Sequence, residues 1–176
     1  MNTTVTLRRA NGSHAPVFHQ IRAEPGASRY QPLRQYSVGR LREILNARAN
    51  LPLDRTLSGK VQWLIESDGE PAGWITLDVT TREHGIASVG YTIMQAFQGR
   101  GVATAAVRPV TELAFDPDRL DLDRLEAVAA VENIGSRRVL AKAGFREEGL
   151  ARQFLVIAGV RVDHVRFGLL RAEWIR

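Results

Sequence analysis

The sequence of 176 residues contains no cysteine, which excludes disulfide bonds, thiolate nucleophiles and zinc sites built on cysteine. Aromatic residues make up only 7% and form no stacking motif, which argues against a specific nucleic-acid-binding module. No apolar run is long enough to cross a membrane, and Met1–Ala10 lacks the apolar core of a signal peptide. We therefore expect a cytoplasmic protein without a membrane partner.

Lysine is also scarce, because only Lys60 and Lys142 are lysines among the 24 Lys and Arg residues. The net charge of +5 could attract polyanions, such as a nucleotide cofactor or ribosomal RNA. The arginines are dispersed along the chain, however, and this favours an ordinary solvated surface. The length and the 44% of hydrophobic residues predict a single domain, residues 1–176, with a sizeable core.

Short elements alternate along the chain and predict a mixed α+β sheet flanked by helices. The expected strands are Val5–Arg9, Val61–Glu66, Trp74–Val79, Ala87–Met94, Leu125–Val131, Phe145–Ile157 and Val160–Leu170. The expected helices are His14–Ala23, Val38–Ala49, Val102–Phe115 and Asn133–Ala143.

Local signals refine these helices. Ser13 and Ser37 precede the first two helices and are predicted to cap them. Pro109 lies inside the third helix, and the apolar spacing continues beyond it, so we expect a kink and not a break. Glu24–Tyr36 contains two prolines and a glycine and is predicted to be a loop.

The segment Gln98-Gly99-Arg100-Gly101-Val102-Ala103 joins a predicted strand to a predicted helix. Glycines in such a turn allow consecutive backbone N–H groups to approach an anion, and the helix dipole also favours negative charge there. This segment therefore predicts a site for a pyrophosphate group. The purely structural alternative is an ordinary strand-to-helix turn that binds no ligand.

A second polar motif follows the next strand. Asn133 and Ser136 are three residues apart, so both lie on one face at the start of a helix. Each has a purely structural alternative, since Asn133 is a good N-cap and Ser136 could be a solvated serine of the first turn. Together with the glycine loop they predict a site for a phosphorylated cofactor.

The two motifs, in this order, resemble those of the GNAT superfamily of N-acetyltransferases. The second motif extends as Asn133-x-x-Ser136-x-x-Val139-Leu140-x-Lys142-x-Gly144-Phe145. The chain is most similar to the ribosomal-protein N-terminal acetyltransferases, through Leu7–Ala10 and Asp163–Arg171. The resemblance covers nearly the whole chain and is weakest over Glu24–Lys60.

The resemblance implies a GNAT fold in which two strands splay apart to form a cleft for acetyl-CoA. Binding of the pyrophosphate is assigned to residues of the glycine loop, namely Gln98, Gly99, Arg100, Gly101, Val102 and Ala103. Backbone groups of Ile93 and Met94 would hold the pantetheine arm, together with Asn133. Ser136 would donate a hydrogen bond to the departing sulfur, with Tyr91 as the alternative acid.

The general base is not identified by the sequence. Many members of the superfamily carry a glutamate two residues before the Gly-Tyr pair, where this chain has Ser88. Other candidates are Glu83, His84, and either Asp163 or His164, because adjacent strand residues face opposite sides. A water-mediated base, or an amine that arrives deprotonated, would also suffice. His14 and His19 lack metal-ligand spacing, so no metal is expected.

Three functions stay open at this point. The first is direct transfer from acetyl-CoA to a primary amine within a ternary complex, since no thiol is present to carry the acetyl group. The acceptor would be a protein or peptide N-terminus, including that of a ribosomal protein, or else a small amine or antibiotic, and the enzyme a monomer or homodimer. The second is a CoA-binding domain that has lost catalysis, and the third is an RNA-binding module.

An acceptor site is predicted between Glu24–Arg40 and the final hairpin, with a basic lip from Arg29, Tyr30, Arg34 and Tyr36.

Overall fold

The computed structural model describes residues 3–174, and its core is a seven-stranded sheet with the strand order β1-β2-β3-β4-β5-β7-β6. All neighbouring strands are antiparallel except β4 and β5, which are parallel. The strands are β1 (Val5–Arg9), β2 (Gly59–Ser67), β3 (Glu70–Thr81), β4 (Ile86–Ile93), β5 (Arg124–Ala130), β6 (Arg146–Ile157) and β7 (Val160–Leu170). The expected mixed α+β sheet is confirmed.

The four helices are α1 (Ala15–Ala23), α2 (Val38–Ala49), α3 (Val102–Phe115) and α4 (Ile134–Lys142). Their bounds agree with the sequence prediction to within two residues. The helix α3 continues through Pro109, as expected from the apolar spacing on both sides of the proline.

The two predicted N-caps have different outcomes. Ser37 caps α2, because its hydroxyl accepts a hydrogen bond from the backbone N–H of Arg40. The prediction for Ser13 is wrong. Asn11 caps a short 3-10 turn, Gly12–His14, which leads directly into α1, and the residue before α1 is His14. Asn11 accepts from the N–H of Ser13, so this earlier asparagine begins the helical segment.

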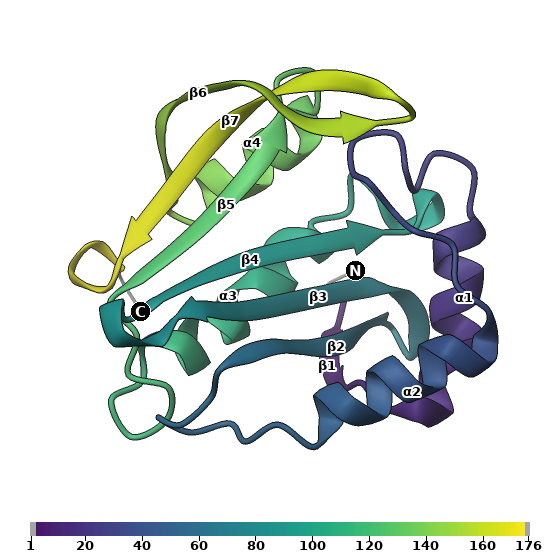
Figure 1. Ribbon diagram of the computed structural model, residues 1–176, viewed down its shortest axis with the longest axis horizontal. Coiled ribbons are helices and arrows are strands. Elements are labelled where there is room, and N and C mark those ends of the chain that lie inside the picture. The colour runs from purple at the N-terminus through teal and green to yellow at the C-terminus, as the bar shows by residue number, and fades with distance from the viewer. Residues whose placement is uncertain (1–2, 175–176) are drawn as a thin grey trace.

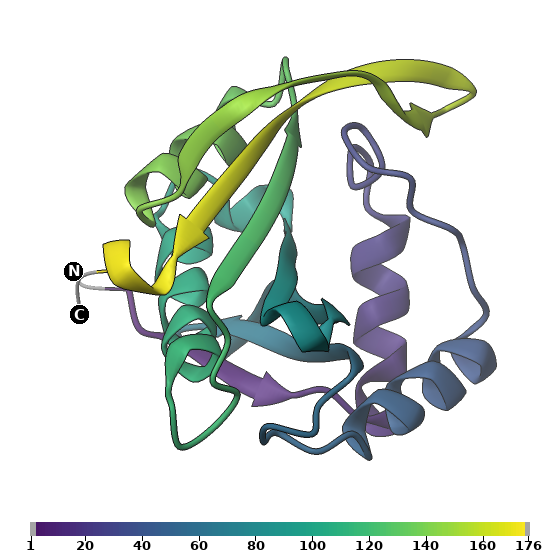
Figure 2. The same ribbon diagram turned by 60° about the vertical axis from the view of Figure 1, so that its left-hand side comes forward.

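The helices cover the two faces of the sheet separately (Figures 1 and 2). The helices α3 and α4 pack on one face against a large apolar core that includes Ile75, Leu77 and Phe167. The helices α1 and α2 cover β2 and β3 on the other face, where Phe18 stacks on Trp74 at a centroid distance of 5.5 Å. This second face carries the loop between α1 and α2, which reaches toward the tip of the β6–β7 hairpin (Figure 2).

The central feature of the sheet is a split between β4 and β5. The two strands pair only from Ile86 with Arg124 to Ser88 with Glu126. Beyond these residues the strands diverge, and Figure 1 shows the gap widening along the two strands. The expected splayed strands are therefore present.

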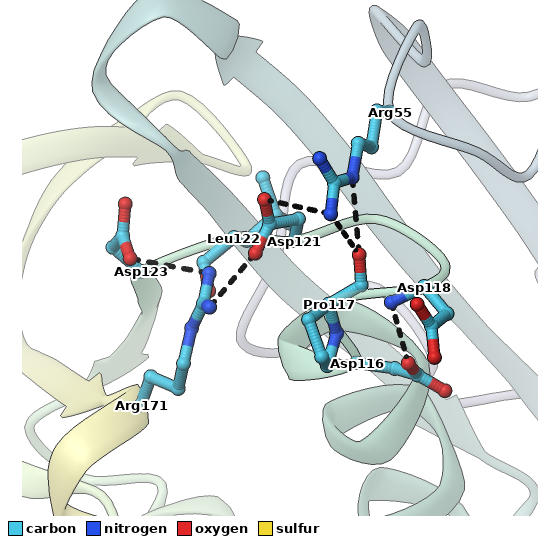
Figure 3. Close-up of polar contacts among 8 residues, drawn as sticks. All are labelled: Arg55, Asp116, Pro117, Asp118, Asp121, Leu122, Asp123 and Arg171. Carbon is cyan, nitrogen blue, oxygen red and sulfur yellow. Dashed lines mark hydrogen bonds and ion pairs between the residues drawn. The ribbon is translucent and has the colours of Figure 1, made fainter.

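The closed end of this split is fixed by an acidic turn between α3 and β5 (Figure 3). The guanidinium of Arg171 bonds Asp121 at 2.8 Å and Asp123 at 3.1 Å, and it donates to the carbonyl of Leu122. From the other side, Arg55 donates to the carbonyl of Pro117 at 3.0 Å. These contacts tie the turn to both the end of β7 and the segment before β2, so β5 begins at a fixed position beside β4.

Among residues 3–174, no helix combines the length and the apolar character that crossing a membrane would require.

Candidate functional site

Among the described residues, the backbone of β4 has no strand partner on the side of the split beyond Ser88. The N–H of Met94 donates to the carbonyl of Ala72 on the β3 side at 2.9 Å. Since hydrogen-bonding direction alternates along an antiparallel pair, Thr92 shares this direction, whereas Tyr91 and Ile93 point their backbone groups toward β5. The N–H of Ile93 therefore faces the split, whereas its carbonyl accepts from the side chain of Gln98 at 2.9 Å. Met94 does not offer its amide to the split, because β3 already occupies it.

The glycine loop lies at the wide end of the split and leads into α3. Gly99 and Gly101 have φ values of +75° and +80°, a left-handed conformation that glycine adopts without steric cost. A Cβ atom added at either position would meet nothing within 4 Å, so the space in front of the loop is open. The side chain of Gln98 folds back and donates to the carbonyl of Ile93 at 2.9 Å. The loop thus has the shape that an anion-binding turn requires.

A carboxylate from the opposite face anchors the start of this loop. Both oxygens of Glu24 accept from the N–H of Gln95, at 3.1 and 3.0 Å. Glu24 follows α1, and Gln95 begins the 3-10 turn Gln95–Phe97 before the glycine loop. Nothing in the local sequence pattern links residues 71 positions apart, so this contact was not predicted from the sequence.

The predicted polar residues of α4 meet Tyr91 across the split. Asn133 is the N-cap of α4, and its side-chain oxygen accepts from the N–H of Ser136 at 3.1 Å. The hydroxyl oxygens of Tyr91 and Ser136 are 2.9 Å apart, and the Tyr91 hydroxyl also donates to the backbone carbonyl of Ser136 at 3.3 Å. The three residues named from the sequence are therefore one connected group that bridges β4 and α4.

Burial determines the protonation state of Tyr91. It raises the pKa of Tyr91 to about 12, although the hydrogen bond to Ser136 acts in the opposite direction. The phenol is therefore neutral near pH 7, so its hydroxyl can donate or accept a hydrogen bond. When Tyr91 donates to the Ser136 hydroxyl oxygen, the hydroxyl hydrogen of Ser136 remains available for another acceptor.

The residues considered as general bases are mostly placed elsewhere. Glu83 and His84 are exposed in a turn before β4, at the closed end of the split. Asp163 accepts from the N–H of Gln153 at 2.7 Å and so fixes an irregularity in β6. His164 is 1% exposed, bonds the carbonyl of Val162 through Nδ1 and leaves Nε2 without a partner in the described residues.

A pocket of about 320 Å³ opens on the face of α1 and α2 and reaches β4 at the split. Its floor is formed by strand residues that include Trp74, Thr76, Gly90 and Tyr91. Its walls come from α1, α2 and the loop between them. Tyr91 thus borders this pocket and also contacts Ser136 of α4.

The charged residues that line this pocket are all cations: Arg22, Arg34, Arg48 and Lys60. Of the four residues predicted to form a basic lip, Arg34 and Tyr36 line the pocket, whereas Arg29 and Tyr30 contact each other and do not line it. Arg22 and Arg48 also line the pocket and were not predicted from the sequence. A usable signal was present, since Arg48 continues the apolar spacing of Leu41 and Leu45 on one face of α2.

The segments predicted to hold the acceptor also meet. A second pocket of about 320 Å³ lies between the α1–α2 loop, from Ser28 to Arg34, and the hairpin tip at Val156 and Ala158. The long loop and the final hairpin are therefore neighbours in space, as the sequence analysis expected.

A known protein family matches most of this chain. The model of the acetyltransferase (GNAT) domain matches residues 4–146 of the chain. The chain belongs to the GNAT family of acetyltransferases.

Relatives within the family differ in what their names state. A Bacillus subtilis protein named "Putative ribosomal N-acetyltransferase YdaF" is 40% identical over 107 residues, which are 61% of this chain. The match spans 57% of that relative's length. The structure of Mycobacterium smegmatis RimJ with CoA-disulfide is 27% identical, covers 98% of this chain and 84% of its own, and has a TM-score of 0.79. Vibrio cholerae spermidine N-acetyltransferase with CoA and spermine is 21% identical, covers 98% of both chains and has a TM-score of 0.82, a likeness of fold alone.

Proposed function

We propose that this protein transfers an acetyl group from acetyl-CoA directly to the α-amine of a protein or peptide N-terminus. The observation that carries this proposal is the pocket that reaches Tyr91, whose charged lining residues are cations and which contains no carboxylate or histidine among the described residues. Membership of the GNAT family and the CoA-bound structure of M. smegmatis RimJ support acetyl-CoA as the donor.

The residues of this chain fit CoA. The open space before Gly99 and Gly101 admits phosphate oxygens close to the backbone, at the N-terminus of α3. The backbone groups of Tyr91 and the N–H of Ile93 face the split and are placed to pair with an extended arm, as a peptide strand adds to a sheet edge. Acetyl-CoA supplies the acetyl group as a thioester.

Ser136 and Tyr91 assist departure of the thiolate in this proposal. In this arrangement the Tyr91 hydroxyl donates a hydrogen bond to the Ser136 hydroxyl oxygen, 2.9 Å away, which leaves the Ser136 hydrogen free for another acceptor. Ser136 then donates a hydrogen bond to the developing thiolate, where charge appears only in the transition state. Tyr91 is the positioning residue in this arrangement, and Asn133 holds the first turn of α4.

The pocket lining selects the kind of amine. A nucleophilic amine must be neutral, and the lining provides no carboxylate or histidine to remove its proton. An α-amine has an ordinary pKa of about 7.7–8.0, whereas that of a lysine-type amine is about 10.4, so a far larger fraction of an α-amine is neutral near pH 7. Cations around the pocket repel a polyamine as well. Both effects favour an N-terminal α-amine.

The spermidine acetyltransferases among the structural neighbours make a polyamine the second candidate acceptor. The test compares initial rates of acetyl-CoA consumption with a neutral N-terminal peptide and with spermidine, at low ionic strength and pH 7. We expect kcat/KM to be at least about tenfold higher for the peptide, because every charged side chain of the pocket is cationic. A preference for spermidine would contradict the proposal and assign the protein to small-amine acetylation.

A further inference from the structure

Two guanidinium groups in the acceptor pocket have no carboxylate partner. Arg22 lies at the end of α1 and Arg48 near the end of α2, and both line the pocket beside the floor strands. Neither group is within 4 Å of a carboxylate oxygen of residues 3–174. Charged groups that are partly withdrawn from water are usually paired, so this arrangement calls for an explanation.

The contacts of Arg22 hold its position without neutralising it. Its guanidinium lies over the rings of Tyr36 and Trp74, at 5.2 and 5.4 Å from their centroids. Its Nε donates to the carbonyl of Arg34 at 3.1 Å. These two cation–π contacts and the hydrogen bond hold the guanidinium in place while it keeps its charge.

Arg48 is fixed in a similar way by a neutral partner. Its Nη1 donates to the side-chain oxygen of Gln62, a buried residue of β2, at 2.6 Å. The neighbouring carboxylate of Asp78 is already paired with Lys60 at 3.1 Å. Burial lowers the pKa of Arg48, and the charge of Arg22 lowers it further, against the opposing effect of Asp78. The two arginines therefore line one pocket, and neither forms an ion pair with a carboxylate of residues 3–174.

We infer that Arg22 and Arg48 form a binding site for a carboxylate carried by the acceptor near its reactive amine. Planar guanidinium groups held in place match a carboxylate through charge-assisted hydrogen bonds. The pocket continues from these arginines to Gly90 and Tyr91, so a molecule bound here would direct its amine toward the split. This inference rests on the proposed function and narrows its substrate class to amines that carry an acidic group.

The carboxylate could belong to an acidic side chain of a peptide or to a free amino acid. The experiment therefore uses four acceptors: an Ala-Asp peptide amide, its Ala-Asn counterpart, free L-alanine and L-alanine amide. We expect the wild-type kcat/KM to be about tenfold or more higher for the acidic member of one pair, the gain typical of a charge-assisted hydrogen bond. Preference within the first pair identifies a peptide side chain, and preference within the second pair identifies an α-carboxylate.

Substitutions of the two arginines show whether these residues cause the preference for the acidic acceptor. R48Q and R22Q should each reduce the preference for the acidic member several-fold, mainly through KM, while R42Q should leave it unchanged. Arg42 is an appropriate control because it lies on α2, as Arg48 does, is exposed and does not line the pocket. R48K should retain part of the preference, since it keeps the charge but not the planar fork. Equal rates within both pairs for the wild type would overturn the inference, as would a preference that survives in both R22Q and R48Q.

Failure of the inference differs from failure of the proposed function. If no acceptor is acetylated although CoA binds, the proposed transfer itself is wrong. If both members of each pair are acetylated equally, transfer stands and the arginine site does not. Thermal unfolding of each variant shows whether a loss of preference reflects a loss of fold.

Discussion

Replacing Gly101 with valine is expected to weaken CoA binding by at least about tenfold while leaving the fold intact. The φ of Gly101 is +80°, and a side chain in this left-handed region costs about 1–2 kcal/mol. In G101V the loop either keeps its conformation when CoA binds, at the cost of this strain, or it relaxes. Relaxation would turn the backbone N–H groups away from the phosphates. A β-branched Cβ would also occupy the open space in front of the loop.

The matched control is G69V. Gly69 has a φ of +87° and equally open surroundings, but it lies in the β2–β3 hairpin. Isothermal titration calorimetry with CoA measures the affinity, and circular dichroism with thermal unfolding measures the fold. Both variants place a valine at a positive φ. A loss of CoA affinity in G101V but not in G69V would therefore come from the glycine loop and not from backbone strain alone. Wild-type affinity in a folded G101V protein would refute this assignment of the pyrophosphate site.

Replacing Ser136 with alanine is expected to lower kcat by about tenfold to a hundredfold, with a much smaller change in KM. The hydrogen bond from Ser136 is needed chiefly where the thiolate develops, so its loss raises the barrier and affects ground-state binding little. Steady-state kinetics at varied acetyl-CoA concentration separates the two parameters. The control S58A removes a hydroxyl from an exposed residue before β2.

Tyr91 provides an internal check on this result. If Tyr91 acts through Ser136, Y91F should lower kcat in the wild type but add little in the S136A background, because residues in one network are not additive. If S136A changed only KM, Ser136 would be a binding residue, and the proton donor would be the Tyr91 hydroxyl.

The sequence predicted the local structure around the candidate site residues where that structure depends on short-range pattern. The glycine loop, Asn133 and Ser136 sit at helix starts, where short-range chemistry determines the structure. Ser37 was predicted correctly for the same reason. Ser13 was not, because Asn11 competes for the same backbone donors and begins the helical segment two residues earlier.

Other features depend on the direction of hydrogen bonds between strands or on distant contacts. Met94 and Ile93 are adjacent, yet the pairing with β3 decides that only Ile93 faces the split. The link from Glu24 to Gln95 and the convergence of Arg22 with Arg48 join segments far apart in the chain. Hydrophobic periodicity carries no information about such pairs, although it does place Arg48 on the packed face of α2.

Hydrogen exchange at β4, measured residue by residue by NMR with and without CoA, tests most directly whether the arm of CoA binds in the split. The amides of Tyr91 and Ile93 face β5 beyond the last paired residues, so saturating CoA should slow their exchange. The amide of Met94 is the internal control, because it is already bonded to Ala72 and should change little. Unchanged exchange at Tyr91 and Ile93 under saturating CoA would contradict the proposed cofactor site.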